Sequence, residues 1–271
     1  MDNKQNIIKA IQLGLRRGYN QNLRFKNKFI SFESKMTEYL LTVAVANELS
    51  EINDYGKLVS IEVEYSLYEF YNNAFPKAIW TNEDDLFASS EYLKREYEAG
   101  SSKKRIDIAV LYDDNNGLIN KYRSLHGVEI KSVNTHYSGI INDLGRLSDS
   151  MITDFDRTGS NSIQSCYSAF IKSYSDNSKP IYKSEIISNQ KLIIEFLENM
   201  LDTNFRKNSK YNSLQYLIHK DNIDSTSFEE YIKQNKNIPD FDLFWDPNSE
   251  TGDVLGIVIE IKKNNLKANN K

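Results

Sequence analysis

Two segments in the middle of the chain, residues 105–112 and 126–132, alternate apolar and polar residues with the two-residue period of a β-strand. Side chains on a strand point in turn to opposite faces of a sheet. Asp107 of the first segment is therefore expected on the face opposite to its apolar neighbours. That apolar face is formed by Ile106, Ile108 and Val110.

The second segment places Val128 and Ile130 on one face, and Glu129 and Lys131 on the other. If the two segments are neighbours in one sheet, Asp107 comes close to both charged residues. The result is a cluster of two carboxylates and one ammonium group at the rim of an apolar sheet. A plain ion pair between Asp107 and Lys131 across the strands is the alternative interpretation.

Helical and strand periods recur along the rest of the chain and indicate an α/β fold, with a mixed central sheet flanked by helices. A helix over 34–50 begins at Ser34, which is a suitable N-cap. Residues 156–188 are rich in Ser, Asn and Tyr and have no readable period. The other predicted elements are helices over 5–17 (ending near Gly18), 89–98, 138–155, 192–201 and 226–234, and strands over 58–65, 241–245 and 255–262.

Composition limits the range of functions. The chain has 271 residues with 39% hydrophobic residues, which is enough for one buried core. The single cysteine, Cys166, cannot form an internal disulfide and suits a reducing cytosol. No apolar stretch is long enough to span a membrane, and the polar N-terminus does not match a secretory signal, so a cytoplasmic protein is expected. Glycine-rich phosphate loops and zinc-type His/Cys spacings are absent, which argues against a nucleotide cofactor and zinc catalysis.

Charge is distributed unevenly although the net charge is only −4. Residues 1–36 contain eight basic and two acidic residues, whereas residues 37–100 contain four basic and thirteen acidic residues. This asymmetry favours one face that meets a polyanion. A solvated amphipathic terminal helix would give the same counts.

Asp107, followed after a connection by Glu129-Ile130-Lys131, resembles the pattern of the PD-(D/E)xK nuclease superfamily, which includes many restriction endonucleases. The order of helix, strands and helix around these residues is similar to the family's core. Ile106 stands where the family pattern has proline. The resemblance implies a restriction-endonuclease-like core over about 30–155.

The resemblance also implies a single nuclease-like domain over 1–271 and a chemistry. Accessory and recognition elements would come from 1–30, 68–100 and 156–237, followed by a C-terminal hairpin over 238–265. Asp107 and Glu129 would bind Mg²⁺, and Lys131 would orient the attacking water. Glu38, near the start of the 34–50 helix, would join this catalytic set. An acidic residue in a first helical turn can also serve only to complement the helix dipole.

Polar residues beside the two strands are candidates for contacts with DNA. Lys103, Lys104 and Arg105 precede the first strand and would meet backbone phosphates. The second strand is followed by Ser132, Asn134 and His136, which could contact sugar, phosphate or base edges. Arg146, on the polar side of the predicted 138–155 helix, is expected at a solvated surface position, with a phosphate contact as the alternative.

A second match to the family pattern lies near the C-terminus. Pro239-Asp240 is followed by Glu260-Ile261-Lys262, and this set includes the proline. Only nine residues follow Lys262, which leaves no room for the downstream helix and strand, so the first set is preferred. The alternative for Glu260 and Lys262 is a solvated ladder in a terminal hairpin.

The expected function is therefore a Mg²⁺-dependent endonuclease that hydrolyses double-stranded DNA, most simply a type II restriction-type enzyme. Homodimerisation is implied by the resemblance, since two copies would present one site to each strand. Two other readings stay open: a repair or transposition nuclease with the same chemistry, and a non-catalytic DNA-binding or assembly subunit with a nuclease-like fold.

Overall fold

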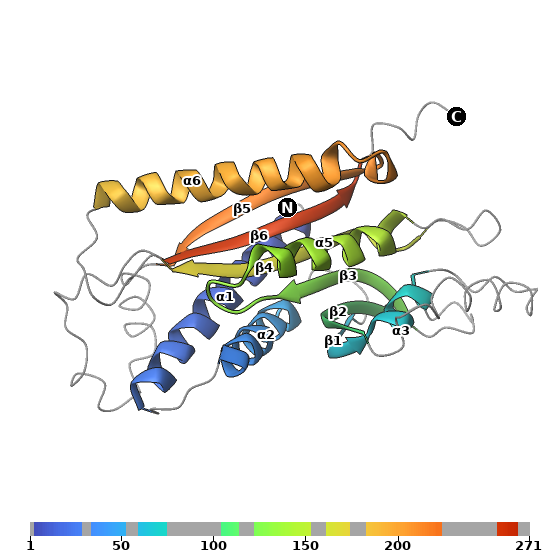
Figure 1. Cartoon of the computed structure of the whole chain (residues 1–271). Coiled ribbons are helices and arrows are strands. Elements are labelled where there is room, and N and C mark those ends of the chain that lie inside the picture. Colours follow the sequence, from blue (N-terminus) through green and yellow to red (C-terminus); the bar gives the residue numbers. More distant parts are fainter. Residues whose placement is uncertain are drawn as a thin grey trace, which may run out of the picture.

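A computed structural model describes residues 3–28, 34–52, 59–74, 104–113, 122–152, 161–173, 183–223 and 254–264. Its centre is a six-stranded sheet in the order β1-β2-β3-β4-β6-β5 (Figure 1). β3 and β4 are parallel, and every other neighbouring pair in this sheet is antiparallel. The predicted α/β class with a mixed sheet is confirmed. The strands are β1 (Val59–Ser66), β2 (Arg105–Asp113), β3 (Tyr122–Ile130), β4 (Ser165–Ser173), β5 (Leu214–Ile223) and β6 (Val254–Lys263).

Helices cover both faces of the sheet. The described α-helices are α1 (Asn3–Lys28), α2 (Ser34–Ser50), α3 (Leu67–Asn72), α5 (Tyr137–Ile152) and α6 (Lys183–Leu201). A π-helical turn (Asp202–Arg206) and a 3₁₀ turn (Ser209–Tyr211) connect α6 to β5. None of the helices in these segments combines the length and the apolar character that crossing a membrane would require.

Two hydrophobic cores result, one on each side of the sheet. The α5–α6 core lies on the face covered by these two helices and α3, and includes Phe70, Ile140, Leu144, Leu147 and Leu197. The α1–α2 core lies on the opposite face and includes Ile7, Ile11, Leu15, Leu41 and Val45. Because each face is buried, β2, β4 and β6 place apolar residues on both faces of the sheet.

The first helix continues beyond the residue at which it was expected to end. Gly18 lies inside α1, which ends at Lys28. A Cβ on Gly14 would lie 2.4 Å from Val45 Cα, and one on Gly18 would lie 2.9 Å from Leu41 Cα. Both glycines therefore permit the close crossing of α1 over α2 and do not terminate the helix, so the predicted end near Gly18 is wrong.

Two strands lie in regions where no strand was predicted. β4 lies in the Ser/Asn/Tyr-rich region, and β5 lies between the predicted helices 192–201 and 226–234, where no element was predicted. β6 is paired along both edges, with β4 and with β5. It is therefore an interior strand of the sheet and not the margin of a terminal hairpin. The expected elements at 89–98, 226–234 and 241–245 lie outside the described residues.

Candidate functional site

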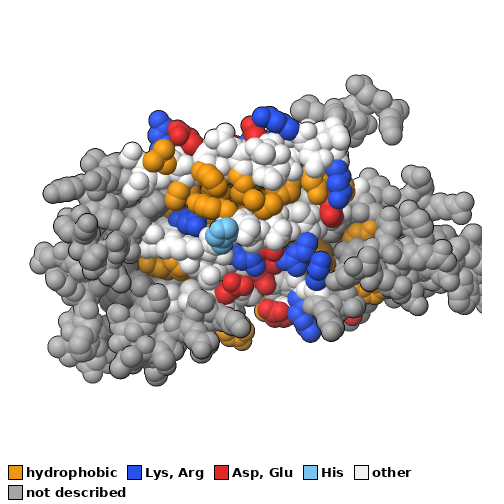
Figure 2. All heavy atoms as spheres, viewed as in Figure 1, with side chains coloured by type: hydrophobic (Ala, Val, Ile, Leu, Met, Phe, Trp, Pro, Cys, Tyr) orange, Lys and Arg blue, Asp and Glu red, His pale blue; other side chains and the backbone are white. Residues whose placement is uncertain are grey.

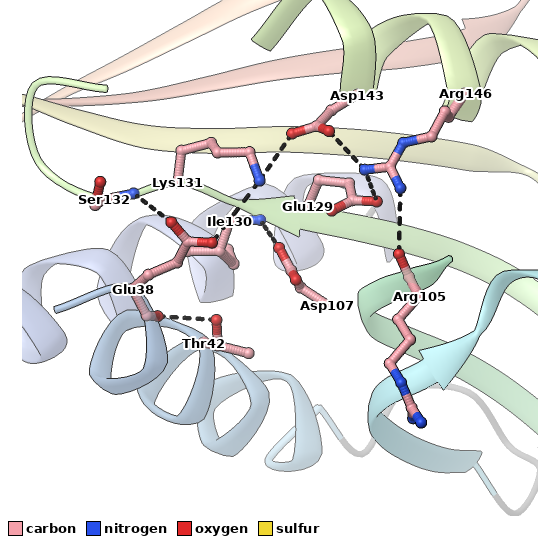
Figure 3. Close-up of polar contacts among 10 residues, drawn as sticks. All are labelled: Glu38, Thr42, Arg105, Asp107, Glu129, Ile130, Lys131, Ser132, Asp143 and Arg146. Atoms are coloured by element: carbon pink, nitrogen blue, oxygen red, sulfur yellow. Dashed lines mark hydrogen bonds and ion pairs between the residues drawn. The ribbon is translucent and has the colours of Figure 1, made fainter. Parts of the chain in front are cut away.

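β2 and β3 separate at Asp107. Their regular pairing extends as far as Ile108 opposite Val128. Beyond this pair, the main-chain N–H of Ile130 donates a hydrogen bond of 2.6 Å to Oδ2 of Asp107 (Figure 3). The carboxylate thus takes the place of a main-chain acceptor where the ladder stops, and this fixes its position between the two strands.

The alternation of β2 breaks at the same residue. Ile108 and Val110 pack in the α1–α2 core, whereas Ile106 packs in the α5–α6 core. The expectation that Ile106 shares a face with Ile108 and Val110 is therefore wrong. Gly127 on β3 makes room for Ile106 on that face, since a Cβ on Gly127 would lie 2.5 Å from Ile106 Cδ1.

Glu129 and Lys131 share one face, as their alternation predicted, and both point toward α5 (Figure 3). Glu129 is only 2% exposed and accepts a hydrogen bond of 3.0 Å from Nη2 of Arg146. Lys131 Nζ lies 3.0 Å from Oδ2 of Asp143. Both partners come from α5, which follows β3 directly in the chain.

Glu38 reaches the same place from α2, on the other side of Lys131 (Figure 3). Its Oε1 lies 3.8 Å from Lys131 Nζ, and its Oε2 accepts a hydrogen bond of 3.3 Å from the main-chain N–H of Ser132. The four residues predicted to be catalytic are thus brought together by β2, the end of β3 and the distant helix α2. Their catalytic roles stay a prediction.

Two further members of the site were not predicted as such from the sequence. Asp143 is buried, and its Oδ1 accepts a hydrogen bond of 2.5 Å from Nη2 of Arg146. Arg146 was interpreted as a surface residue with a possible phosphate contact. A signal was available for Asp143, because it lies three residues after Ile140 and four before Leu147, on the apolar stripe of α5. We call these six residues the charged cluster: Glu38, Asp107, Glu129, Lys131, Asp143 and Arg146.

The charged cluster is short of positive charge. Four carboxylates against two cations leave a formal charge of −2 when all six groups are ionised. Burial, and then repulsion from Asp107 and Asp143, raises the pKa of Glu129 well above its usual range. Burial is also the main cause that raises the pKa of Asp107 and of Glu38. Figure 2 shows charged side chains gathered in the middle of the face that α5 and α6 cover, below a band of hydrophobic side chains.

Lys131 is held as a cation by the same neighbours. Burial alone would lower the pKa of its ammonium group, but the charge of Asp143 and a hydrogen bond with it raise that pKa, with further contributions from Asp107 and Glu38. The pKa of Lys131 is therefore above its ordinary value. Lys131 is a charged donor, and it is not a candidate general base.

The donor set suits a hard divalent cation. Among the described residues, no three His, Cys, Asp or Glu side chains form a ready-made metal cage. Mg²⁺ seldom uses such a cage, since it is usually held by one or two carboxylates together with water and substrate phosphate. Asp107 and Glu129 provide two carboxylates in a cluster with a formal charge of −2, and burial is the main cause that raises their pKa values. The chemistry of these residues therefore fits Mg²⁺.

The basic residues predicted to meet phosphate lie at the start of β2. Lys104 and Arg105 are exposed, and Lys103 lies outside the described residues. Arg105 donates a hydrogen bond of 2.7 Å from Nη1 to the main-chain oxygen of Glu64. Its guanidinium group points away from the charged cluster (Figure 3).

The polar residues after β3 have structural contacts of their own. Asn134 has a φ of 57° and accepts a hydrogen bond of 2.9 Å from the main-chain N–H of Ser173, so it shapes the turn between β3 and α5. His136 is exposed, with Nδ1 2.8 Å from Oγ of Ser138. Ser132 contributes its main-chain N–H to Glu38. Contacts with DNA stay predictions for these residues.

The second match to the family pattern has a different environment. Asp240 lies outside the described residues. Glu260 is buried in the interior strand β6, and its Oε2 lies 3.0 Å from Nε2 of His219 on β5. The alternative of a solvated ladder at the sheet margin is therefore wrong for Glu260, because β6 is an interior strand and the Glu260 side chain is buried.

Comparison of the chain with protein-family models, with curated proteins and with solved structures found no match.

Replacing Asp107 with asparagine is expected to stabilise the fold. Because the pKa of Asp107 is raised in the folded protein, its contribution to stability is fully present below the unfolded pKa and declines as pH rises through the folded pKa. Asparagine keeps an acceptor for Ile130 and removes the buried charge. In chelator, the melting temperature of Asp107→Asn should exceed that of the wild type at pH 8, with a smaller difference at pH 5. An unchanged difference between the two pH values would contradict this account.

Proposed function

We propose that this chain is a Mg²⁺-dependent endonuclease that hydrolyses DNA phosphodiester bonds, with a restriction-endonuclease-like core. The observation that carries the proposal is the convergence of Asp107, Glu129 and Lys131 at the point where β2 and β3 separate. Glu38 approaches Lys131 from the opposite side. Metal-assisted phosphodiester hydrolysis uses carboxylates that hold a cation and a charged group beside the phosphate. This site offers two such carboxylates and one ammonium group, and the −2 charge of the cluster favours a bound cation.

The arrangement of elements supports the same proposal. α2 is followed by the three antiparallel strands β1, β2 and β3, then by α5 and the parallel strand β4. This agrees with the order of helix, strands and helix expected for the core of the PD-(D/E)xK superfamily. A connection between parallel strands needs a crossover, which α5 provides, and α5 also brings Asp143 and Arg146 to the site.

Each residue of the proposed site has its own role in the reaction. Asp107 and Glu129 would hold Mg²⁺, which when bound polarises the scissile phosphate and lowers the pKa of a coordinated water. Lys131, kept charged by Asp143, would orient that water and offset negative charge that develops on the phosphate oxygens. Glu38, tied to the Ser132 N–H, would help to set the position of Lys131.

A cleavage assay tests the proposal. Supercoiled plasmid and mapped linear DNA are incubated with the protein in Mg²⁺ and, separately, in chelator. Discrete fragments in Mg²⁺ alone, absent with Asp107→Asn, are the expected result and would indicate a restriction-type enzyme. Cutting that depends on nicks or branches would favour a repair or transposition nuclease. DNA binding without any cutting would favour a non-catalytic subunit and would overturn the proposal.

The proposal has consequences for partners and location. A restriction-type enzyme must cut both strands, and two copies of the chain would present one site to each strand. We therefore expect a homodimer on double-stranded DNA in the cytoplasm. The oligomeric state can be measured by sedimentation with and without DNA.

Binding of the divalent ion should be visible without any DNA. A ligand that binds only the folded state stabilises it by about 2.7 kcal/mol at 100 times its Kd. We expect Mg²⁺ to raise the melting temperature of the wild type because it offsets the −2 charge of the cluster. Asp107→Asn, which removes one proposed ligand, should respond less. An equal response of both proteins would place the bound ion elsewhere.

A further inference from the structure

We propose that Asp143 is a positioning residue, which holds the ammonium group of Lys131 and the guanidinium group of Arg146 in the positions that the proposed reaction requires. The inference rests on the proposed nuclease function and adds a second layer to the site. Asp143 lies on α5 and is only 5% exposed. Each of its oxygens meets a different cation: Oδ2 lies 3.0 Å from Lys131 Nζ, and Oδ1 lies 2.5 Å from Arg146 Nη2.

Arg146 passes this restraint on to Glu129. The same Nη2 atom that meets Asp143 also lies 3.0 Å from Oε1 of Glu129. Nη1 of Arg146 is 3.4 Å from the main-chain oxygen of Arg105, at the start of β2. Asp143 therefore restrains one proposed metal ligand through Arg146, and the proposed water-orienting group directly.

The direction of the restraint is important for Lys131. Its ammonium group lies between Asp143 on α5 and Glu38 on α2, at 3.0 and 3.8 Å. If Asp143 lost its charge, the attraction toward α5 would weaken, and the flexible lysine side chain would move toward Glu38. A shift of about 1 Å in a catalytic group is enough to lower a rate about 100-fold.

Aspartate is suited to this place because it offers an acceptor oxygen to each of two cations. Asparagine has the same shape but only one acceptor oxygen, and its NH₂ group would face one of the cations. Asp143→Asn must therefore release either Lys131 or Arg146. A buried carboxylate without partners is strongly unfavourable. The contacts with two cations therefore explain why a charged side chain can be buried at position 143.

The test is a double-mutant cycle between Asp143→Asn and Lys131→Ala, with the full chain cutting plasmid DNA in Mg²⁺. We expect Asp143→Asn alone to lower kcat about 10- to 100-fold, with DNA affinity in Ca²⁺ unchanged. In the Lys131→Ala background, the same replacement should have a much smaller effect, because the group that it positions is gone. Equal effects in both backgrounds, or wild-type kcat in Asp143→Asn, would overturn the positioning role.

Asp149→Asn is the matched control. Asp149 lies on the same helix, is about half exposed, and pairs with Lys210 at 2.7 Å, away from the charged cluster. Its replacement should leave kcat unchanged. If Asp143→Asn fails to fold by circular dichroism, Asp143→Glu takes its place in the cycle. It keeps both oxygens but displaces them, so we expect a smaller loss with the same dependence on Lys131.

A second readout separates this inference from the proposed function. In chelator and without DNA, the urea midpoints of the four proteins of the cycle should be non-additive, since Asp143 and Lys131 are in contact. Additive midpoints would overturn the contact itself. If the wild type does not cut DNA at all, the proposed function fails and the positioning role fails with it. Cutting with additive kcat effects overturns the positioning role alone.

Discussion

Lys131→Ala should cut DNA about 100- to 1,000-fold more slowly than the wild type, which is the range found when one preorganised donor is removed from an active site. The variant removes the only ammonium group of the charged cluster, which lies within 4 Å of both Glu38 and Asp143. Because its neighbours keep Lys131 charged, alanine removes a positive charge at the place where negative charge would develop. Initial rates of plasmid nicking in Mg²⁺ measure the loss.

Lys191→Ala provides the matched control for this prediction. Lys191 is 78% exposed on α6, and its Nζ lies 3.8 Å from Oε1 of Glu195, one turn away. Its replacement should change neither the rate nor the melting temperature. Circular dichroism establishes that both variants are folded. A Lys131→Ala protein that is folded and cuts at the wild-type rate would remove lysine from the mechanism.

Gly14→Ala should destabilise the fold, although alanine is the better helix former. A Cβ at Gly14 would lie 2.4 Å from Val45 Cα and 2.8 Å from Val45 N, which are backbone atoms that cannot rotate away. Helices α1 and α2 must therefore move apart, at a cost of about 1–3 kcal/mol for such overpacking. Since α2 carries Glu38, the movement should also reach the charged cluster. Urea unfolding gives the change in the free energy of unfolding.

Gly145→Ala is the control with the opposite sign. Gly145 lies inside α5, and a Cβ there would meet nothing within 4 Å. Alanine should stabilise this helix by up to about 1 kcal/mol, because it is the better helix former. If both substitutions shift the urea midpoint in the same direction, close crossing of α1 and α2 is not what requires glycine at position 14.

The centre of the site could be predicted because its members are local to two strands. Alternation alone places Glu129 and Lys131 on one face, and the pairing of β2 with β3 brings Asp107 to them. Glu38 could be proposed only through the family resemblance. Its distance from Lys131 depends on how α2 crosses the sheet, which no periodicity specifies.

β4, β5 and the contacts of Arg146 could not be predicted from the sequence, for physical reasons that the structure explains. β4 is buried along nearly its whole length, and its serine and alanine residues fit under helices on both faces, so it shows no alternation. β5 alternates only weakly, since its polar residues Asp221 and Asn222 bind Arg16 and Gln190. Arg146 looked like a surface residue because its partners, Asp143 and Glu129, are neighbours only after α5 has docked on the sheet.

The interior place of β6 has a consequence for the order of folding. β4 and β5 both precede β6 in the chain, yet each is joined to the other only through it. Until residues 254–263 leave the ribosome, each of the two earlier strands lacks the partner that covers its edge in the finished sheet. Pairing over such sequence separations is slow, and uncovered strand edges invite aggregation. β5 should therefore join the sheet only after β6 has been synthesised, whereas β1 to β4 can pair before it.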